Sequence, residues 1–288
     1  MEQVRSYRRR GTPDMPMAVY RNNASVRGSH PKPEYHPETE IVWVNAGHLE
    51  LQVDGITYGY REGDIFVIPG NAVHFYQGLS PDVEYMSVVF SPDALQLQPQ
   101  HFFQKFFTAP LEEGRLQLPR LLQLGHPAYR AVREQLELIH NTQIYEKDYK
   151  LRRFGALIAI CVAVAPYCTE VEGDRSIQEM GNEAVRQCMR YIHNNYAMKL
   201  TLEQLALVCH LHPNYLCALF KEYTGQTVFQ YLTRFRVESA AMLLKHRELP
   251  VGKVGEMVGF HSESLFFRKF KQIMGMTPKV FAKMQKQE

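Results

Sequence analysis

The sequence predicts an α+β protein in which an antiparallel β-barrel or jelly roll precedes an all-helical region. Three observations predict this class. Short apolar runs separated by turn-forming residues fill residues 36–90. Two stretches of helical periodicity follow between 128 and 165, and one helix-turn-helix pattern occurs twice after residue 200. A length of 288 residues allows each region its own core, so we expect two domains.

The barrel strands are predicted from short runs rich in apolar and β-branched residues, at 41–44, 49–53, 65–68 and 85–90. Turn formers separate the runs, at Asn45-Ala46-Gly47, Asp54-Gly55, Glu62-Gly63-Asp64 and Pro69-Gly70-Asn71. Short turns favour antiparallel pairing of the strands that they connect. We expect the barrel over about residues 18–110.

Two helices are predicted next, as a hairpin over about residues 126–167. The first has an apolar stripe formed by Val132, Leu136 and Ile139. The second has a stripe formed by Leu151, Phe154, Leu157, Ile158 and Cys161. The polar stretch 169–181 lacks periodicity and is predicted to be a linker between a domain at 1–168 and a domain at 182–288.

The first helix-turn-helix copy is the segment 200–229, LTLEQLALVCHLHPNYLCALFKEYTGQTVF. Thr201 and Gln204 have capping-box spacing, so a helix should begin at Thr201 and end near Cys209. A turn at 210–212 should follow.

Pro213 suits the first position of the second helix of this copy, which should end near Gly225. Its inward residues are Leu216, Leu219 and Phe220. Its outward residues, which are candidates for DNA contact, are Asn214, Tyr215, Cys217, Ala218 and Lys221.

The second copy is the segment 249–281, LPVGKVGEMVGFHSESLFFRKFKQIMGMTPKVF. A turn at 259–261 should lead to Ser262 as the N-cap of a helix that ends at Gly275. The inward residues of this copy are Val254, Val258, Phe266 and Phe270. The candidates for DNA contact are Ser262, Glu263, Ser264, Arg268 and Lys271.

A single long helix is predicted between the copies, from about Thr227 to His246. Its apolar positions recur at steps of three and four: Val228, Leu232, Phe235, Ser239 and Met242. Twenty helical residues span about 30 Å, which is close to the roughly 34 Å of one duplex turn. The two copies are therefore predicted to read successive major grooves on one side of double-stranded DNA.

Charge is distributed unevenly along the chain, whose net formal charge is +3. From Asn182 onward there are 15 Lys and Arg against 8 Glu and no Asp, a formal charge of +7, which leaves −4 for the first 181 residues. The positive excess coincides with the repeated motif, so it is expected to face phosphate groups.

Residues 182–285 resemble the DNA-binding domain of the AraC/XylS family of bacterial transcription regulators, most closely in VGEMVGFHSESLFFRKFKQIMGMTP at 254–278. By this resemblance, base and phosphate contacts fall on Asn214, Cys217, Ala218, Lys221, Glu263, Ser264 and Arg268. Many members have Ser-Arg where this chain has Cys217-Ala218. Without that arginine the first recognition helix loses its best candidate for a bidentate guanine contact, so base readout by this helix is in question.

Residues 28–78 resemble the two motifs of cupin barrels, with Gly28, Glu34, His36, Glu40 and Gly47 in the first and Gly63, Pro69, Asn71 and His74 in the second. Glu34 stands where the family usually has histidine, and Asn71 where it usually has glycine. The resemblance implies that Glu34, His36, Glu40 and His74 converge.

The preferred interpretation of these four residues is a site for a small polar effector, such as a sugar or a related metabolite, with no metal cofactor. The alternative is a divalent metal ion on the same residues, in a metal sensor or a metal-dependent enzyme fused to a DNA-binding domain. No further acid, base or nucleophile accompanies the four positions, so we expect a regulator and not an enzyme.

The remaining expectations concern partners and location. By family resemblance one helix of the hairpin forms a homodimer interface, and RNA polymerase is a further expected partner. The longest apolar run, 156–165, is too short for a membrane span, and neither signal peptide nor anchor is evident, so we expect a cytoplasmic protein. Five cysteines without a Cys-x-x-Cys pair indicate buried thiols. Arg8-Arg9-Arg10 is expected to be a solvated tail, or by resemblance an effector-gated arm.

Overall fold

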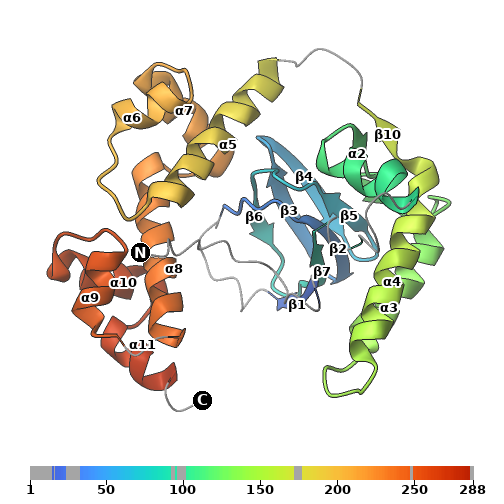
Figure 1. Cartoon of the computed structure of the whole chain (residues 1–288). Coiled ribbons are helices and arrows are strands. Elements are labelled where there is room, and N and C mark those ends of the chain that lie inside the picture. Colours follow the sequence, from blue (N-terminus) through green and yellow to red (C-terminus); the bar gives the residue numbers. More distant parts are fainter. Residues whose placement is uncertain are drawn as a thin grey trace. The chain divides into compact units, whose positions relative to one another are not determined.

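The computed structural model describes residues 15, 17–23, 33–91, 95, 102–171, 177–246 and 249–285. These residues form two compact units, one before residue 172 and one from Ile177 onward (Figure 1). The predicted arginine tail at 8–10 and Gly28 of the first barrel motif lie outside the described residues.

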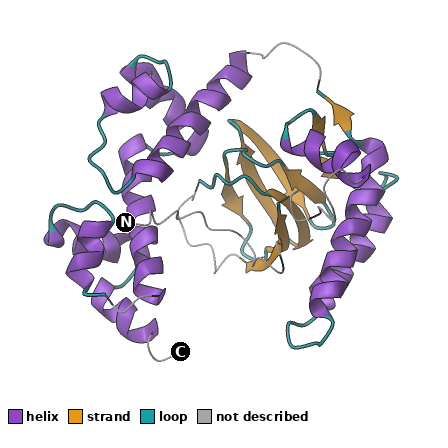
Figure 2. Ribbon diagram, in the orientation of Figure 1, coloured by secondary structure: helices purple, strands orange, loops and turns teal. Residues whose placement is uncertain are grey.

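Antiparallel sheets dominate the first unit, which confirms the predicted class (Figure 2). The five-stranded sheet has the order β1 (Met17–Asn23), β7 (Glu84–Phe90), β2 (Thr39–Ala46), β5 (Ile65–Ile68) and β9 (Leu121–Leu122). The three-stranded sheet has the order β4 (Ile56–Arg61), β3 (His48–Val53) and β6 (His74–Leu79). The four predicted strands correspond to β2, β3, β5 and β7.

The predicted turns join these strands through left-handed backbone conformations. Gly47, between β2 and β3, has φ 71°, and a Cβ at this position would lie 2.9 Å from Val83 Cα. Glycine is needed there because no other residue combines that φ with such a close approach. Asp54, Gly55 and Gly63 also have positive φ.

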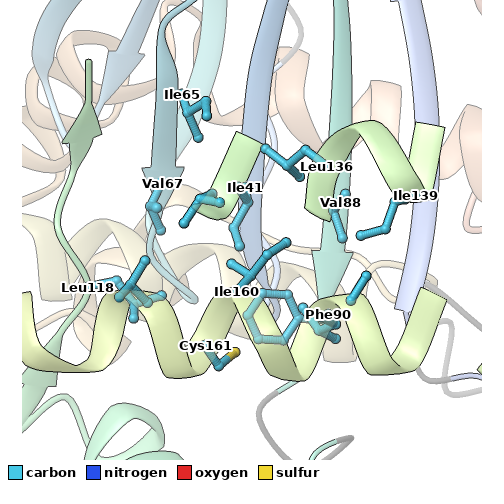
Figure 3. Close-up of a cluster of buried hydrophobic side chains, with 14 of the residues drawn as sticks. Ile41, Ile65, Val67, Val88, Phe90, Leu118, Leu136, Ile139, Ile160 and Cys161 are labelled. Atoms are coloured by element: carbon cyan, nitrogen blue, oxygen red, sulfur yellow. The ribbon is translucent and has the colours of Figure 1, made fainter. Parts of the chain in front are cut away.

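The five-stranded sheet buries both of its faces. Along β2, Val42 and Val44 pack between the two sheets, whereas Ile41 and Trp43 pack toward a helical layer. Figure 3 shows this second core, in which sheet residues meet helix residues: Ile41, Ile65, Val67, Val88, Phe90, Leu118, Leu136, Ile139, Ile160 and Cys161. Burial on both faces explains why the strands at 41–44 and 65–68 are apolar throughout and do not alternate.

The helical layer consists of α3 (Tyr129–Asn141) and α4 (Tyr149–Val164), the predicted hairpin. The stripe predicted on α3 is buried as expected. On α4 the prediction was partly wrong: Leu151 is 74% exposed and Phe154 and Ile158 are only half-buried. The residues that α4 buries are Ala156, Leu157, Ile160, Cys161 and Val164. Since α4 is apolar around most of its circumference, periodicity could not identify the face that packs on the sheet.

Short elements surround the hairpin: η2 (Gln104–Thr108), α2 (Ala109–Glu112), β8 (Leu116–Gln117), η3 (Ala165–Tyr167) and β10 (Thr169–Glu170). β10 pairs with β8, and α5 (Ile177–Asn195) begins inside the segment predicted to be the linker. The linker at 169–181 was therefore predicted too long, because a two-residue strand and the first turn of a helix carry no periodic signal. Residues 172–176 lie outside the described residues.

All regular structure described in the second unit is helical. After α5 come α6 (Leu202–Val208), α7 (Pro213–Thr224), α8 (Val228–His246), α9 (Val251–Met257), α10 (Glu263–Met274) and α11 (Pro278–Gln285) (Figure 1). α6 with α7, and α9 with α10, are the two predicted helix-turn-helix copies. α5 and α11 were not predicted as helices.

The long helix between the copies is confirmed, since α8 runs without interruption for 19 residues. Its buried surface is wider than the single predicted stripe, because both copies pack against it. Phe235 and Met242 are half-buried, whereas Tyr231, Val237, Ala240 and Leu244, outside the predicted stripe, are buried.

Candidate DNA-binding surface and effector site

The ends of α6 and α7 in the first copy agree with the helix ends predicted from the sequence. Thr201 accepts a hydrogen bond from the Gln204 backbone N–H, and the Gln204 side chain accepts one from the Thr201 N–H, which completes the capping box. His210 turns the chain with φ 54°, and His212 is the N-cap of α7. Gly225, with φ 69°, ends α7. The use of His212 as N-cap was not predicted.

The second copy repeats this construction. Ser262 Oγ accepts a hydrogen bond from the Leu265 N–H at 3.3 Å and lies 3.0 Å from Ser264 Oγ. Gly275, with φ 77°, ends α10, and its N–H donates to Lys271 O, as the Gly225 N–H donates to Lys221 O. Lys221 and Lys271 thus occupy corresponding places in α7 and α10.

The predicted DNA-contacting side chains all lie on solvent-exposed positions of the two recognition helices. On α7 they are Asn214, Tyr215, Cys217, Ala218 and Lys221. On α10 and its cap they are Ser262, Glu263, Ser264, Arg268 and Lys271. The opposite faces carry Leu216, Leu219 and Phe220 in α7 and Phe266 and Phe270 in α10, all buried. Each of the two helices therefore has one buried face and one exposed face.

The cysteines were predicted to be buried, and only Cys217 is exposed. All five cysteines are free; Cys161, Cys188 and Cys209 are buried, and Cys168 is half-buried. Burial raises the pKa of the Cys161 thiol to about 12, which keeps it protonated and unreactive. Cys217, on the free face of α7, is exposed.

In the barrel unit, the four predicted effector residues are brought together. Glu34 and His74 are linked by two backbone hydrogen bonds of 2.7 and 3.1 Å. The rings of His36 and His74 meet edge to face with centroids 5.0 Å apart. Glu40 Oε2 lies 3.5 Å from His36 Nε2 and 3.6 Å from His74 Nε2. Glu40, His36 and His74 are buried, and Glu34 is half-buried.

Backbone carbonyls determine the orientation of both histidine rings. His36 Nδ1 lies 3.0 Å from Glu38 O, and His74 Nδ1 lies 3.0 Å from Ala72 O. A carbonyl oxygen can only accept, so each Nδ1 carries the proton that it donates. Nε2 is then an acceptor or metal ligand in a neutral ring and a donor in a protonated one, and both Nε2 atoms are buried beside Glu40 without a hydrogen-bond partner of normal length.

The Glu40 carboxylate is the charged centre of this cluster. Burial acts to raise its pKa, but hydrogen bonding and positive charge from His36 and His74 outweigh burial and hold the pKa well below its ordinary value. Glu40 is therefore ionised at neutral pH. An ionised carboxylate beside both Nε2 atoms favours a proton or a cation on them.

The donor set also suits a metal ion. One ligand atom from each of Glu34, His36 and His74 lies within 4.8 Å of the other two. Histidines that donate Nδ1–H to carbonyls and present Nε2 to a shared centre are typical of metal sites. The residues therefore fit a divalent ion as well as a polar organic molecule.

Sequence reasoning missed Glu38 in this cluster. Glu38 is buried, and its Oε2 lies 3.6 Å from His36 Nδ1. The signal was present in the polar residues at 34, 36, 38 and 40, whose spacing of two puts them on one side of an extended chain. Asn71, the departure from glycine in the second motif, has φ 64°, a left-handed conformation that asparagine tolerates.

Comparisons with known proteins agree with both halves of this description. A helix-turn-helix domain model matches residues 205–284, and a cupin domain model matches residues 26–89. The Bacillus subtilis HTH-type transcriptional regulator YisR is 32% identical over 258 residues, covering 83% of each chain. YdeC, from the same organism, is 27% identical over 286 residues, covering 95% of this chain and 94% of its own.

Two further similarities complete the comparison. The Msm operon regulatory protein of Streptococcus mutans is 23% identical over 275 residues, covering 94% of this chain and 93% of its own. Among solved structures, the C-terminal domain of the response regulator AraT from Geobacillus stearothermophilus is 33% identical, with a TM-score of 0.34, and covers 35% of this chain and 84% of its own.

Proposed function

Since the chain belongs to the AraC/XylS family, as a DNA-binding transcription regulator with a cupin domain, we propose that α7 and α10 enter two successive major grooves on one side of a duplex. The observation that carries this proposal is the pair of recognition helices with free, matching faces on either end of α8. The 19 residues of α8 span roughly 30 Å, close to the roughly 34 Å of one duplex turn.

The proposed contacts divide by chemistry. Arg268, Glu263 and Ser264 on α10 have side chains that can donate to or accept from base edges, so α10 supplies most of the sequence readout. α7 contributes Asn214, with Tyr215, Cys217 and Ala218 in apolar contact. Lys221 and Lys271 neutralise phosphates, and Ser262 lies at the N-terminus of α10, where a phosphate is also favoured.

Selection from random duplexes tests this proposal. The full chain should enrich a motif with two blocks about 10 base pairs apart, the block under α10 being better defined than that under α7. Recovery of unrelated sequences after repeated rounds would contradict specific recognition. Mapping DNA occupancy in cells would then identify target operons, whose encoded activities indicate the effector.

In the same proposal the barrel cluster of Glu34, His36, Glu40 and His74 binds a small polar effector, a sugar or a related metabolite. Hydroxyl groups suit this cluster because they donate to the Glu40 carboxylate and to a neutral Nε2 while accepting from other donors. Effector binding would shift the equilibrium between arrangements of the two units and so change which DNA segments the protein can occupy.

A ligand screen tests the effector site. Trp43 is the only tryptophan, lies on β2 and is buried, so its fluorescence reports on the barrel unit. A true effector should stabilise the wild type against heat and shift this fluorescence, and Glu40→Gln should remove both effects. An exposed carboxylate of the same unit, in Glu134→Gln, is the control that should keep them. Equal responses in all three proteins would exclude this cluster as the site.

A second candidate for the cluster is a divalent transition metal, and the arrangement of the two buried Nε2 atoms favours it. His36, His74 and Glu34 would hold the ion, with Glu40 as a possible fourth ligand or a neighbouring charge. The ion would supply positive charge and a Lewis-acidic centre for an effector oxygen. Metal analysis of protein purified without a histidine tag separates the two candidates. A stoichiometric metal that is lost in His74→Gln supports the metal site. Absence of metal from the wild type supports the metal-free effector site.

Members of this family regulate transcription, so catalysis has no part in the proposal.

The homodimer is proposed to form through the hairpin, because α4 exposes apolar side chains away from the sheet, among them Leu151 (74% exposed) and Val162 (58% exposed). RNA polymerase is the further proposed partner, and the cytoplasm, where bacterial DNA is transcribed, is the proposed location. No helix in the described part of the chain is long and apolar enough to cross a membrane.

A further inference from the structure

One arginine in the middle of α8 contacts both the connection between α5 and α6, which leads into the first helix-turn-helix copy, and the turn of the second copy. Arg236 Nε donates a hydrogen bond of 2.7 Å to Tyr196 O, and its terminal nitrogen donates one of 2.8 Å to Met198 O. These carbonyls directly follow the C-terminal end of α5, where carbonyl groups lack helical partners and a positive charge is favoured. The guanidinium therefore ties α8 to the chain that leads into α6.

The same guanidinium also reaches the second copy. Its central carbon lies 6.0 Å from the centroid of the Phe260 ring, within the range of a cation–π contact. Phe260 is buried in the turn between α9 and α10 and packs on Phe266, with ring centroids 5.2 Å apart. Arg236 is half-buried, and this burial lowers the pKa of its guanidinium from the ordinary value.

Gly259 makes the approach of the second copy to the connection between α5 and α6 possible. Its φ is 90°, and a Cβ at this position would lie 2.8 Å from Tyr196 O and 2.9 Å from Ala197 O. The turn of the second copy thus rests directly on the backbone between α5 and α6. Any side chain at 259 would force this turn away from the connection between α5 and α6.

We propose that this inter-copy junction, formed by Tyr196, Ala197, Met198, Arg236, Gly259 and Phe260, sets the orientation of α10 relative to α7 and thereby the base-pair spacing that the protein accepts. The proposal rests on the proposed binding of both helices to one duplex. α8 fixes how far apart the copies lie, whereas the junction opposes rotation of the α9–α10 turn about α8. Arg236 is a positioning residue in this account and contacts no DNA.

Simultaneous binding makes the spacing measurable. When two contacts share one rigid frame, the second is gained at high effective concentration only if the DNA presents both segments at the right separation. A five-base-pair insertion rotates one segment by about half a turn, to the opposite side of the duplex. A variant without the junction should gain less affinity from the correct spacing, and it should lose less affinity when the spacing is wrong.

The experiment measures affinity of the full chain for four duplexes. The first probe is a site that the wild type selects from random DNA, and the second is the same site with five base pairs inserted between its two blocks. The other two are half-site probes, in each of which a different one of the two blocks is scrambled. We expect the insertion to weaken wild-type binding by about 100-fold. Arg236→Gln should bind the parent site about 10-fold more weakly than the wild type does. Its insertion penalty, the loss of affinity between the parent and the inserted site, should fall below about 5-fold. Its affinity for each site with one scrambled block should stay within about 2-fold of the wild-type value.

Two further variants separate positioning from charge. Gly259→Ala leaves the charge unchanged and should reproduce the reduced insertion penalty, and Arg236→Lys, which keeps the charge but not the two-pronged geometry, should fall between wild type and Arg236→Gln. Circular dichroism confirms folding, and if Arg236→Gln does not fold, the other two variants decide.

Three results have distinct meanings. Loss of half-site affinity by Arg236→Gln, with no effect of Gly259→Ala, would overturn the junction and make Arg236 a phosphate contact. Insertion penalties equal to that of the wild type in every folded variant would also overturn it. Failure of the wild type to enrich any duplex would instead overturn the proposed function.

Discussion

Arg268 is the side chain on the free faces of α7 and α10 with the strongest means of reading a base. A guanidinium can donate two parallel hydrogen bonds to guanine, whereas an ammonium such as that of Lys271 behaves as a point charge toward phosphate. Arg268→Ala should therefore cost about 1–3 kcal/mol on the selected site and relax the preference at one base pair. Lys271→Ala, the matched contrast, should weaken all sequences alike and reduce the salt slope by about 1.

The measurement for this pair is binding to the selected site, to its single-base variants and to unrelated DNA, over a range of salt. If Arg268→Ala loses the same affinity on every duplex, Arg268 reads no base. If Lys271→Ala changes base preference, the assignment of the two residues is reversed.

His193 gives the second unit a pH-dependent stability. It lies in α5, with Nε2 2.6 Å from Tyr231 Oη and its ring stacked on Phe235 at 4.2 Å between centroids. Burial lowers the pKa of His193 to about 4, against roughly 6.5 for an unperturbed histidine. Between these values the unfolded chain binds a proton that the folded protein does not, so stability falls as pH decreases from about 7 toward 4, by up to roughly 3 kcal/mol.

The comparison of wild type with His193→Phe measures this effect. Phenylalanine keeps the stacking but cannot titrate, so urea unfolding followed by circular dichroism should depend less on pH in the variant between pH 7 and 5. The same slope in both proteins would show that folding does not shift the pKa of His193.

At the residue scale, sequence reasoning located the barrel cluster but not its full chemistry. The motif spacing predicted that Glu34, His36, Glu40 and His74 converge, and their side chains do. It did not predict that carbonyls of Glu38 and Ala72 fix the tautomers of both rings, because hydrogen bonds to backbone depend on the local path of the chain. For the same reason Arg236 was not recognised, since its partners lie about 40 residues away in sequence.

At the element scale, α4 provides the surface for the proposed dimer. Its sheet-facing side is buried, whereas Leu151 and Val162 are exposed on the other side. Removing two apolar side chains and adding two positive charges at a self-complementary interface should disfavour association strongly. Leu151→Lys combined with Val162→Lys should therefore convert a dimer into a monomer without loss of the fold.

Light scattering coupled to gel filtration measures this outcome. Leu124→Lys is a matched control, because Leu124 is 84% exposed in the same unit but lies outside both hairpin helices. A dimer that survives in the double variant, or dissociates equally in the control, would remove the outer face of α4 as the interface.

Elements with strong end signals were the ones that the sequence predicted well. A capping box at Thr201, a proline at 213 and glycines at 225 and 275 marked helix ends that the structure reproduces. Elements without such signals were missed. β4 and β6 contain glycine and exposed residues, and α5 starts in a polar stretch, so their pairing and packing partners, distant in sequence, decide their structure.

At the scale of the whole molecule, the separation into a sensing half and a DNA-binding half followed from charge and pattern. The negative first half contains the barrel and the positive second half contains the repeated motif. Tertiary packing adds what composition cannot supply: both copies pack against α8, and Arg236 with Gly259 joins the turn of the second copy to the connection that leads into the first. Two separate DNA-reading elements thus become one body with a defined spacing.

Hydroxyl-radical footprinting of the full chain on a selected site tests this central claim most directly. If α7 and α10 enter successive major grooves, each bound subunit should protect two patches on one side of the duplex, about 10 base pairs apart. Weaker protection of the patch under α7 would agree with the absence of an arginine at Cys217-Ala218. A single patch, or two patches on opposite sides of the duplex, would show that α7 and α10 do not enter successive grooves on one side.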